Sequence, residues 1–480
     1  MIPLRSALAG VVGLVVLGVG AVALRTVTSD ADTTTIAASP NVVVVMTDDQ
    51  TLESMRVMPQ VNDLVGARGI TFSDSVVSFP LCCPSRATFL TGQYMHNHGV
   101  RGNSPPHGGF QAFDDQDTTL PAALQRAGYF TVHIGKYLNG YGVDPPAAVP
   151  PGWDEWHGSI DPTSYDYVGF TLLENGLPRT YGEDDYQADI YTDLATAAVR
   201  RMAGDDKPFF LNVAYLAPHV AREQGTEDDG ADSTATPAPR HVNAFASEPL
   251  PQPASFNEAD VSDKPFAMQQ LPEISEATQA SMANRYARQL ESLQAVDEGV
   301  GRIISTLEET GELDDTVVIF TSDNGYFFGE HRLAKGKVFF YEPAIRVPLL
   351  MRGPGIPVGA VRRSLVANID LAPTILDLAD ATPLREMDGR SLLPLLQAEA
   401  EPDDREVLLE AGGPFAQSRG LRTPGHAIFE HPSGERELYD LANDPDQLLN
   451  RSGDPAFADV EAALVGRLAE LRDCAGTSCQ

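Results

Sequence analysis

The sequence has little cysteine, little tryptophan and, for its length, little positive charge. Only 4 cysteines and 2 tryptophans occur among 480 residues, which excludes a small scaffold held together by many disulfides. Lys and Arg total 34 against 67 for Asp and Glu, so the formal net charge is −33. A field of this sign repels phosphate backbones and anionic lipid surfaces. This balance excludes nucleic acid as a partner and disfavours binding to a membrane surface.

Long hydrophobic runs are also missing, with one exception at the N-terminus. Small and apolar residues fill positions 7–24, between Arg5 and Arg25. A basic residue followed by such a run is typical of a signal peptide or an N-terminal anchor, and we assign residues 1–25 to it. Residues 26–40, rich in Thr, Asp and Ala, are predicted to be a flexible linker. We therefore expect an exported protein, either secreted or anchored by its N-terminus at the outer face of the cell membrane.

The cysteines form two pairs with different expectations. Cys474 and Cys479 lie close together at the C-terminus, and an oxidising compartment would readily close them into a small disulfide loop. Cys82 and Cys83 are adjacent, and a disulfide between adjacent residues is strained. A mutual disulfide therefore does not explain why Cys82 and Cys83 are adjacent.

Two apolar, β-branched segments, residues 41–46 and 316–321, have the composition of strands buried on both faces of a parallel sheet. Each is followed by a pair of side chains that carry oxygen: Asp48 and Asp49 after the first, Asp323 and Asn324 after the second. The carboxyl ends of parallel strands form the sites of such sheets, and hard oxygen ligands suit Ca²⁺ or Mg²⁺. An Asp after a strand is also common as a turn or helix-cap residue, so these pairs alone do not establish a metal site.

The rest of the chain alternates helical and strand patterns, which predicts an α/β fold with a large, doubly wound, mostly parallel sheet flanked by helices. We place this domain at residues 41–395. A smaller C-terminal α+β subdomain, with a short antiparallel sheet and a terminal helix, is expected at residues 396–480. The predicted helices are 120–127, 191–202, 286–309 and 455–472, the last with Val460, Ala463, Leu464, Leu468 and Leu471 on one face; the further strands are 209–216, 347–351, 405–410, 427–430 and 437–440.

Two segments carry a more specific pattern. Residues 80–92 read Pro-Leu-Cys-Cys-Pro-Ser-Arg-Ala-Thr-Phe-Leu-Thr-Gly, and residues 128–138 read Gly-Tyr-Phe-Thr-Val-His-Ile-Gly-Lys-Tyr-Leu. In this order, and together with the two strand-end pairs, they resemble the signatures of the sulfatase family of the alkaline-phosphatase-like superfamily. The resemblance is closest to the branch that contains N-acetylglucosamine-6-sulfatase and the heparan glucosamine-sulfatases.

The resemblance implies a particular chemistry at Cys82. In sulfatases the corresponding cysteine is converted to formylglycine (3-oxoalanine) by a formylglycine-generating enzyme. The aldehyde hydrates to a diol, one hydroxyl attacks sulfur, and the other then expels the sulfate as the aldehyde re-forms. The resemblance also implies a divalent cation, Ca²⁺ or alternatively Mg²⁺, whose ligands would be Asp48, Asp49, Cys82, Asp323 and Asn324.

Three catalytic roles follow from the two signatures and from one strand end. Arg86, four residues after Cys82, corresponds to the arginine that braces the diol and the metal carboxylates. Lys136 corresponds to the lysine that bridges the diol and the sulfate. His219, which follows the predicted strand 209–216, matches the histidine that contacts sulfate and protonates the leaving oxygen.

Two further assignments are less direct. Lys337 matches the family's second lysine by its spacing to Tyr341, and Lys335 is the alternative. Many sulfatases have a histidine two residues after the signature lysine, where this sequence has Leu138, so the base that deprotonates the second hydroxyl stays open. The neighbouring candidates are His98, His133 and Asn139.

The family resemblance favours a carbohydrate sulfate ester, such as a 6-O-sulfated N-acetylglucosamine from glycosaminoglycan degradation. The charge of −33 opposes a highly sulfated polymer, so a monosulfated sugar, a chain end or an aryl sulfate is easier to reconcile. A long insertion, residues 221–265, is expected to shape the substrate mouth with its second half. Two alternatives remain: a phosphonate or phosphate ester hydrolase with the same site, and a non-catalytic protein that binds sulfated glycans through an unmodified Cys82.

Overall fold

A computed structural model describes residues 39–143, 148–222, 233–397, 405–411 and 417–480. The predicted leader and nearly all of the linker lie outside the described residues, as does the acidic stretch 223–232 of the insertion. Within the described ranges, no helix has both the length and the apolar character needed to cross a membrane.

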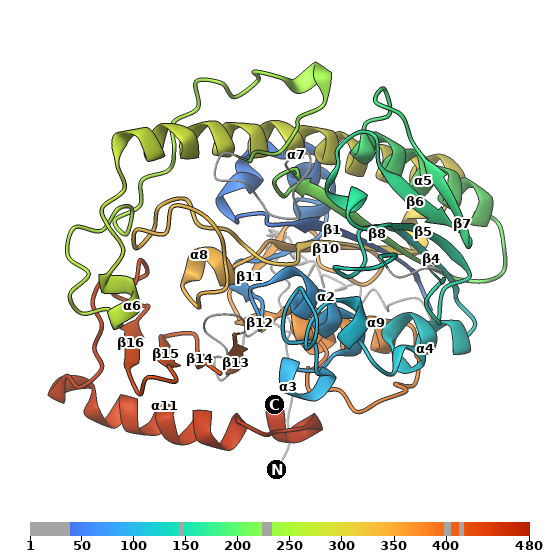
Figure 1. The fold of residues 1–480 in the computed structure, drawn as a ribbon. Helices are drawn as coiled ribbons and strands as arrows, with labels where there is room; N and C mark the ends of the chain where they lie inside the picture. The colour runs from blue at the N-terminus through green and yellow to red at the C-terminus, as the bar shows by residue number, and fades with distance from the viewer. Residues whose placement is uncertain (1–38, 144–147, 223–232, 398–404, 412–416) are drawn as a thin grey trace, which may run out of the picture. The chain divides into compact units, whose positions relative to one another are not determined.

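The core is a ten-stranded sheet with the order β11-β2-β10-β9-β1-β8-β4-β5-β6-β7 (Figure 1). Its five middle strands, from β9 to β5, run parallel. Strand β10 is antiparallel to β9, β6 is antiparallel to β5, and β7 is antiparallel to β6. The strands are β1 (Asn41–Asp48), β2 (Ile70–Phe72), β4 (Phe130–Gly135), β5 (Glu155–Ser159), β6 (Thr171–Glu174), β7 (Leu177–Thr180), β8 (Phe209–Pro218), β9 (Thr316–Ser322), β10 (Leu349–Arg352) and β11 (Ala360–Arg362).

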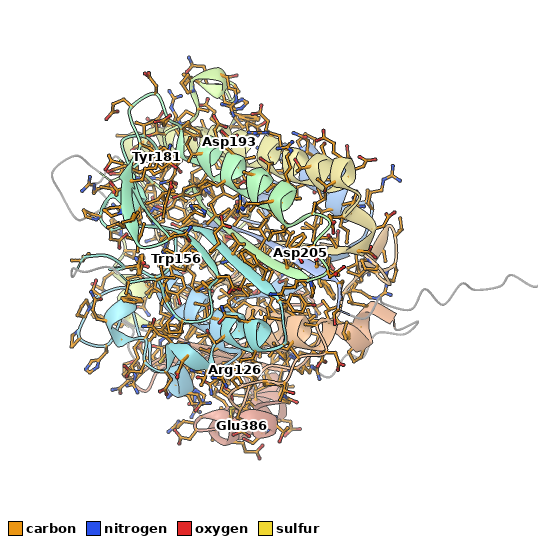
Figure 2. The ribbon with its side chains drawn as sticks, turned by 90° about the vertical axis from the view of Figure 1, so that its right-hand side faces the viewer. Arg126, Trp156, Tyr181, Asp193, Asp205 and Glu386 are labelled. Carbon is orange, nitrogen blue, oxygen red and sulfur yellow. A yellow bond between two sulfur atoms is a disulfide. The ribbon has the colours of Figure 1, made fainter. Side chains whose placement is uncertain are left out.

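Helices cover both faces of this sheet. The valines of β1 point alternately to the two faces and are buried on each. Val43 and Val45 pack in one core cluster with residues of α5 (Gln187–Met202) and α7 (Glu276–Thr310). Val42 and Val44 pack in a second cluster with residues of α2 (Cys82–Thr91), α4 (Leu120–Arg126) and α9 (Leu371–Leu378). Figure 2 shows Trp156 on β5 between α5, which carries Asp193, and α4, which carries Arg126. The predicted doubly wound, mostly parallel α/β architecture is confirmed.

Shorter elements complete this part of the chain. A separate two-stranded parallel sheet joins β3 (Ser75–Val76) to β12 (Val366–Ala367). The short helices are α1 (Pro59–Val61), α3 (Met95–His98), α6 (Phe266–Gln269), α8 (Glu342–Ile345) and α10 (Leu393–Gln397).

Several predicted boundaries need correction. The helix expected at 286–309 begins at Glu276, ten residues earlier, because the Ser275 hydroxyl caps it by accepting a hydrogen bond from the Thr278 amide at 3.2 Å. Its first turns are mostly exposed and therefore lack the apolar period on which the prediction rested. The strand expected at 347–351 is β10, which runs antiparallel to β9.

The C-terminal region forms the predicted antiparallel sheet and terminal helix. The strands are β13 (Val407–Glu410), β14 (Arg419–Arg422), β15 (His426–Glu430) and β16 (Arg436–Asp440), and the helix is α11 (Ala458–Leu471). Strand β14 is additional to the prediction. On α11, Leu464, Leu468 and Leu471 are buried as expected, but Ala463 is exposed.

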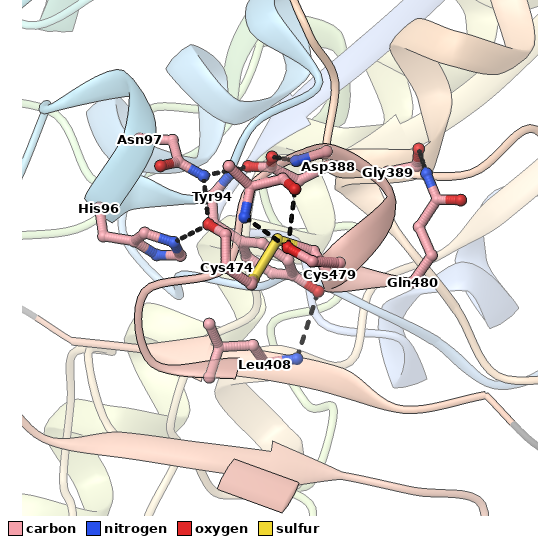
Figure 3. Close-up of a disulfide and its surroundings, with 12 residues drawn as sticks. Tyr94, His96, Asn97, Asp388, Gly389, Leu408, Cys474, Cys479 and Gln480 are labelled. Atoms are coloured by element: carbon pink, nitrogen blue, oxygen red, sulfur yellow. Dashed lines mark hydrogen bonds between the residues drawn. A yellow bond between two sulfur atoms is a disulfide. The ribbon is translucent and has the colours of Figure 1, made fainter. Parts of the chain in front are cut away.

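The predicted disulfide between Cys474 and Cys479 is present (Figure 3). It follows α11 and presents the Cys474 carbonyl to His96 and Asn97 of α3, which donate hydrogen bonds of 2.8 and 2.9 Å. The C-terminal sheet therefore shares contacts and a core cluster with earlier parts of the chain. A division between residues 395 and 396 stays a prediction.

Candidate active site

The ends of β1 and β9 bring the two predicted oxygen-bearing pairs together. Asp48 ends β1, and Asp323 and Asn324 directly follow β9, its parallel neighbour. The Asp49 amide donates to Asp323 Oδ1 at 3.3 Å, and Asn324 Nδ2 donates to Asp49 Oδ1 at 2.6 Å. All four residues are at most 1% exposed. Asp49 adopts a φ of +67°, which turns the chain sharply at the strand end.

Cys82 meets this cluster from the other side, as the first residue of α2. Its Sγ lies 3.4 Å from Asp48 Oδ1, and the residue is fully buried. Burial and the charge of Asp48 raise the pKa of the Cys82 thiol, while burial raises the pKa of Cys83 to about 12. Both therefore remain thiols at neutral pH, and an unmodified Cys82 is a poor nucleophile.

Two cations neutralise the carboxylates from within the core. Arg86, one helical turn after Cys82, donates from Nε to Asp323 Oδ2 at 2.7 Å and from Nη2 to Asp48 Oδ2 at 3.2 Å. Lys136, which directly follows β4, pairs with Asp48. Arg86 Nη1 also donates to the Lys136 carbonyl at 2.8 Å, so one guanidinium joins three segments of the site.

Lys337 and His219 approach from two loops. Lys337 pairs with Asp49 and donates to Cys82 Sγ at 3.1 Å, whereas Lys335 is exposed. His219 follows Pro218, the last residue of β8. Its Nδ1 donates to the Val220 carbonyl at 2.7 Å, and its Nε2 lies 3.6 Å from Asp49 Oδ2.

The charged side chains of this site shift one another's pKa values. Burial alone would raise the pKa of Asp48, but Lys136, His219 and Arg86 hold it far below its usual value. Burial and the neighbouring Asp48 raise the pKa of Asp323. Burial would lower the pKa of Lys136, but Asp48 holds it well above 10.5. Three carboxylates thus face three permanent cations, and a divalent ion would leave an excess of positive charge suited to an anionic ester.

The donor set fits Ca²⁺ or Mg²⁺. Asp48, Asp49, Cys82 and His219 place one potential ligand atom each within 4.8 Å of one another. Asn324 Oδ1 is buried without a hydrogen-bond partner in the described structure, and a buried orphan oxygen of this kind calls for a cation or a water. Carboxylate and amide oxygens are the ligands that these hard cations prefer.

Two of the three candidate bases, His98 and His133, have both ring nitrogens engaged in the core, whereas the third, Asn139, contacts Tyr165 next to Lys136. His98 uses both ring nitrogens, towards Thr88 and the Val100 amide, and His133 uses both towards Asn212 and the Gly135 carbonyl. Burial lowers the pKa of each to about 3, so they are neutral core residues. Because both nitrogens of each ring are engaged, neither histidine has a nitrogen available to act as the base.

Sequence reasoning missed Tyr165 and Asn103. Lys136 Nζ lies 4.5 Å from the centroid of the Tyr165 ring, and Asn139 donates to the Tyr165 hydroxyl at 2.5 Å. Asn103 Oδ1 accepts a 3.0 Å hydrogen bond from the Cys83 amide, in the first turn of α2. Neither residue belongs to a recognisable motif, so the sequence offered no signal for them.

Comparison with known proteins agrees with this geometry. Residues 40–381 match the sulfatase family, and residues 329–474 match the C-terminal region of N-sulphoglucosamine sulphohydrolase. The chain belongs to the sulfatase family. The expected enzyme class, sulfuric ester hydrolase, is thereby confirmed at the level of the family.

Individual sulfatases are similar over most of the chain. Human N-acetylglucosamine-6-sulfatase is 33% identical over 92% of this chain and 86% of its own length. The extracellular sulfatase Sulf-1 homolog of Caenorhabditis elegans is 38% identical over 74% of this chain, which spans only 49% of that longer protein. A solved structure, described as a complex with its substrate D-glucosamine-2-N,6-O-disulfate, is 27% identical, with a TM-score of 0.74 over 90% of this chain and 97% of that one.

Proposed function

We propose that this chain hydrolyses carbohydrate sulfate esters, with 6-O-sulfated glucosamine derivatives as the substrate class. The observation that carries the proposal is the convergence on Cys82 of an oxygen-ligand cluster and the side chains of Lys337, Lys136 and Arg86. The similarity to human N-acetylglucosamine-6-sulfatase over nearly the whole chain supports the substrate class.

Cys82 is the residue whose modification the reaction requires. As formylglycine it would supply, in its hydrated form, a hydroxyl nucleophile that the buried thiol does not offer. A Ca²⁺ or Mg²⁺ ion held by Asp48, Asp49, residue 82, Asp323 and Asn324 would screen the charge of the sulfate and lower the pKa of the nucleophile.

The chain's own cations and His219 do the remaining work. Lys136 pairs with Asp48, and Lys337 contacts residue 82. Both cations neutralise the sulfate oxygens, while Arg86 holds Asp48 and Asp323 in place. His219 presents Nε2 to the site because its Nδ1 is committed to a backbone carbonyl. This nitrogen protonates the oxygen of the leaving alcohol as the sulfur–oxygen bond breaks.

The charge distribution favours substrates with few sulfates. The site gathers cations, but the chain as a whole carries −33 and would repel a densely sulfated polymer. A singly sulfated sugar or the end of a chain brings one anion to the site without placing others against the acidic surface. The disulfated sugar named for the similar solved structure is compatible with such a small substrate.

Export and maturation complete the proposal. A cleaved leader or an N-terminal anchor would place the enzyme outside the cytoplasm, in line with the extracellular designation of the nematode relative. A formylglycine-generating enzyme is then needed as a partner before or during export.

The test uses the full-length protein co-produced with a formylglycine-generating enzyme and supplied with Ca²⁺. Release of nitrophenol from its sulfate, phosphate monoester and phosphonate monoester ranks the reaction classes. Sulfate release from N-acetylglucosamine 6-sulfate then tests the substrate class. A wide preference for a phosphorus ester would establish the rival hydrolase, and sulfated-glycan binding without turnover of any ester would establish the non-catalytic alternative.

A further inference from the structure

We propose that Tyr165 is a positioning residue that fixes Lys136 and His219 relative to each other for departure of the leaving alcohol. The inference rests on the proposed sulfatase function and extends it to a residue outside the family signatures. Tyr165 is partly buried, and its ring contacts both side chains. The Lys136 ammonium lies 4.5 Å from its ring centroid, and the His219 ring lies 5.1 Å away at an interplanar angle of 54°.

The Lys136 contact is a cation–π interaction in a water-poor setting. Lys136 is 2% exposed, so its ammonium has little water to orient it. Asp48 pairs with the ammonium, and the Tyr165 ring attracts it as well. The two contacts together define one position for Nζ, where a single ion pair would leave the long side chain free to pivot.

The backbone ties Tyr165 to the segment that carries His219. Tyr165 ends a 3₁₀ turn, Thr163–Tyr165, between β5 and β6, and its carbonyl accepts a 3.2 Å hydrogen bond from the Arg222 amide. Arg222 is also paired with Asp166 at 2.8 Å. The Tyr167 hydroxyl donates to the His219 carbonyl at 2.6 Å. These hydrogen bonds join the Tyr165 segment to the His219 loop, and the ring of Tyr165 is thereby suited to hold the imidazole.

The hydroxyl of Tyr165 has a separate contact. It accepts a hydrogen bond from Asn139 Nδ2, while Asn139 Oδ1 is buried with no partner in the described part of the chain. Burial raises the pKa of the Tyr165 phenol, which keeps its proton. Asn139 thus anchors the ring at its polar end, and the ring face remains for Lys136 and His219.

The chemical consequence depends on the leaving group. When the sulfur–oxygen ester bond breaks, its electron pair passes to the leaving oxygen, which takes a proton from His219 Nε2. A sugar alkoxide needs this proton, whereas a nitrophenolate is stable enough to leave without it. A misplaced imidazole therefore slows sugar sulfates much more than nitrophenyl sulfate. Displacement of Lys136 alone, or general disturbance of the site, would slow both alike, because both substrates carry the same sulfate group.

The experiment compares the wild-type holoenzyme with Tyr165→Leu and Tyr165→Phe on N-acetylglucosamine 6-sulfate and on 4-nitrophenyl sulfate. We expect Tyr165→Leu to lower kcat on the sugar sulfate by about 100-fold and on the nitrophenyl ester by less than about tenfold. Tyr165→Phe keeps the ring and should restore most of the sugar-sulfate rate. The ratio of the two rates is independent of the fraction of enzyme that folds.

Equal losses on the two substrates, or no loss on either, would overturn the role of Tyr165 and leave the proposed function intact. Failure of Tyr165→Phe to recover the ratio would also overturn it, because the ring would then not be the group that matters. If the wild-type protein hydrolyses neither sulfate after verified maturation, the proposed function itself fails. Tyr181→Leu serves as the control, since the Tyr181 hydroxyl donates to Glu174 and its ring stacks on Phe170, neither of which is a site residue.

Discussion

The ammonium of Lys337 donates a hydrogen bond to the sulfur of Cys82 over 3.1 Å, although 255 positions separate the two residues in the chain. The contact depends on a segment with no regular structure. The Val338 amide donates to the Pro80 carbonyl at 3.0 Å, which binds the neighbour of Lys337 to the residues just before α2. This backbone hydrogen bond therefore holds the segment that carries Lys337 next to Cys82.

This contact separates the two candidate lysines. Lys337→Ala should lower kcat/KM on sulfate esters by at least about 100-fold, because a preorganised cation next to the reacting group is lost. Lys335→Ala removes an exposed lysine two positions away and is expected to leave turnover near the wild-type value. Steady-state kinetics of the two variants make the comparison. A larger loss in Lys335→Ala would reverse the assignment.

The metal assignment is tested most cleanly at Asp323 with an isosteric change. Asp323→Asn keeps a hydrogen-bond acceptor for Arg86, whereas alanine would leave that buried guanidinium short of a partner at a cost of about 3–5 kcal/mol. We expect Asp323→Asn to weaken Ca²⁺ binding by at least about tenfold, as measured by titration calorimetry after chelation.

Asp297→Asn is the matched control, since Asp297 is a buried carboxylate that accepts hydrogen bonds from the Gln60 and Val61 amides at the α1–α7 contact. It should lower stability without changing Ca²⁺ affinity. Unchanged Ca²⁺ affinity in Asp323→Asn would show that the ion, if bound, is held by another set of ligands.

The pH dependence of stability should carry a contribution from His96. Burial lowers the pKa of His96, but the hydrogen bond and charge of Glu410 raise it overall above 6.5. A raised pKa means that the folded state binds the proton more tightly than the unfolded state. The stabilisation is therefore complete below pH 6.5 and is lost as the pH rises through the raised value.

Melting temperatures of wild type and His96→Gln, measured between about pH 6 and 9, isolate this effect by difference. The gap between the two proteins should narrow as the pH rises. A gap that widens with pH would mean that the His96–Glu410 contact stabilises through the neutral imidazole.

Loss of the C-terminal disulfide should destabilise the fold locally and spare the chemistry. The loop that it closes is short, so replacing both cysteines with serine is expected to cost about 2 kcal/mol. The Cys474 carbonyl would lose its fixed position as acceptor for His96 and Asn97 (Figure 3). Denaturant unfolding should report the loss, while kcat stays near the wild-type value; a collapse of kcat with intact folding would contradict this view.

The strand ends of the site could be predicted from the sequence because their physics is local. A run of valines buried on both faces defines β1, and a similar run defines β9. Since the two strands are parallel neighbours, the residues after them must meet. The helical spacing from Cys82 to Arg86 is equally local. These features can be predicted from the hydrophobic periodicity of the sequence and the direction of the strands alone.

The position of Tyr165 and the hydrogen bonds that hold His98 and His133 in the core could not be predicted in this way. Tyr165 lies in a turn next to β5, whose sequence Glu-Trp-His-Gly-Ser has no alternating or β-branched pattern. His98 and His133 are close to the signatures in sequence, but their rings point into hydrogen bonds within the core. Lys337 could be predicted only from its spacing in the family pattern, because the hydrogen bonds that position it produce no periodic pattern in the sequence.

The most direct test of the account is the mass of the tryptic peptide spanning residues 69–86, which contains Cys82, from fully processed protein of the native host. The account predicts a peptide lighter than the cysteine form by the difference between a CH₂SH group and an aldehyde, with the change located at position 82 by fragmentation. Complete recovery of an alkylated thiol at Cys82 in catalytically active protein would contradict it.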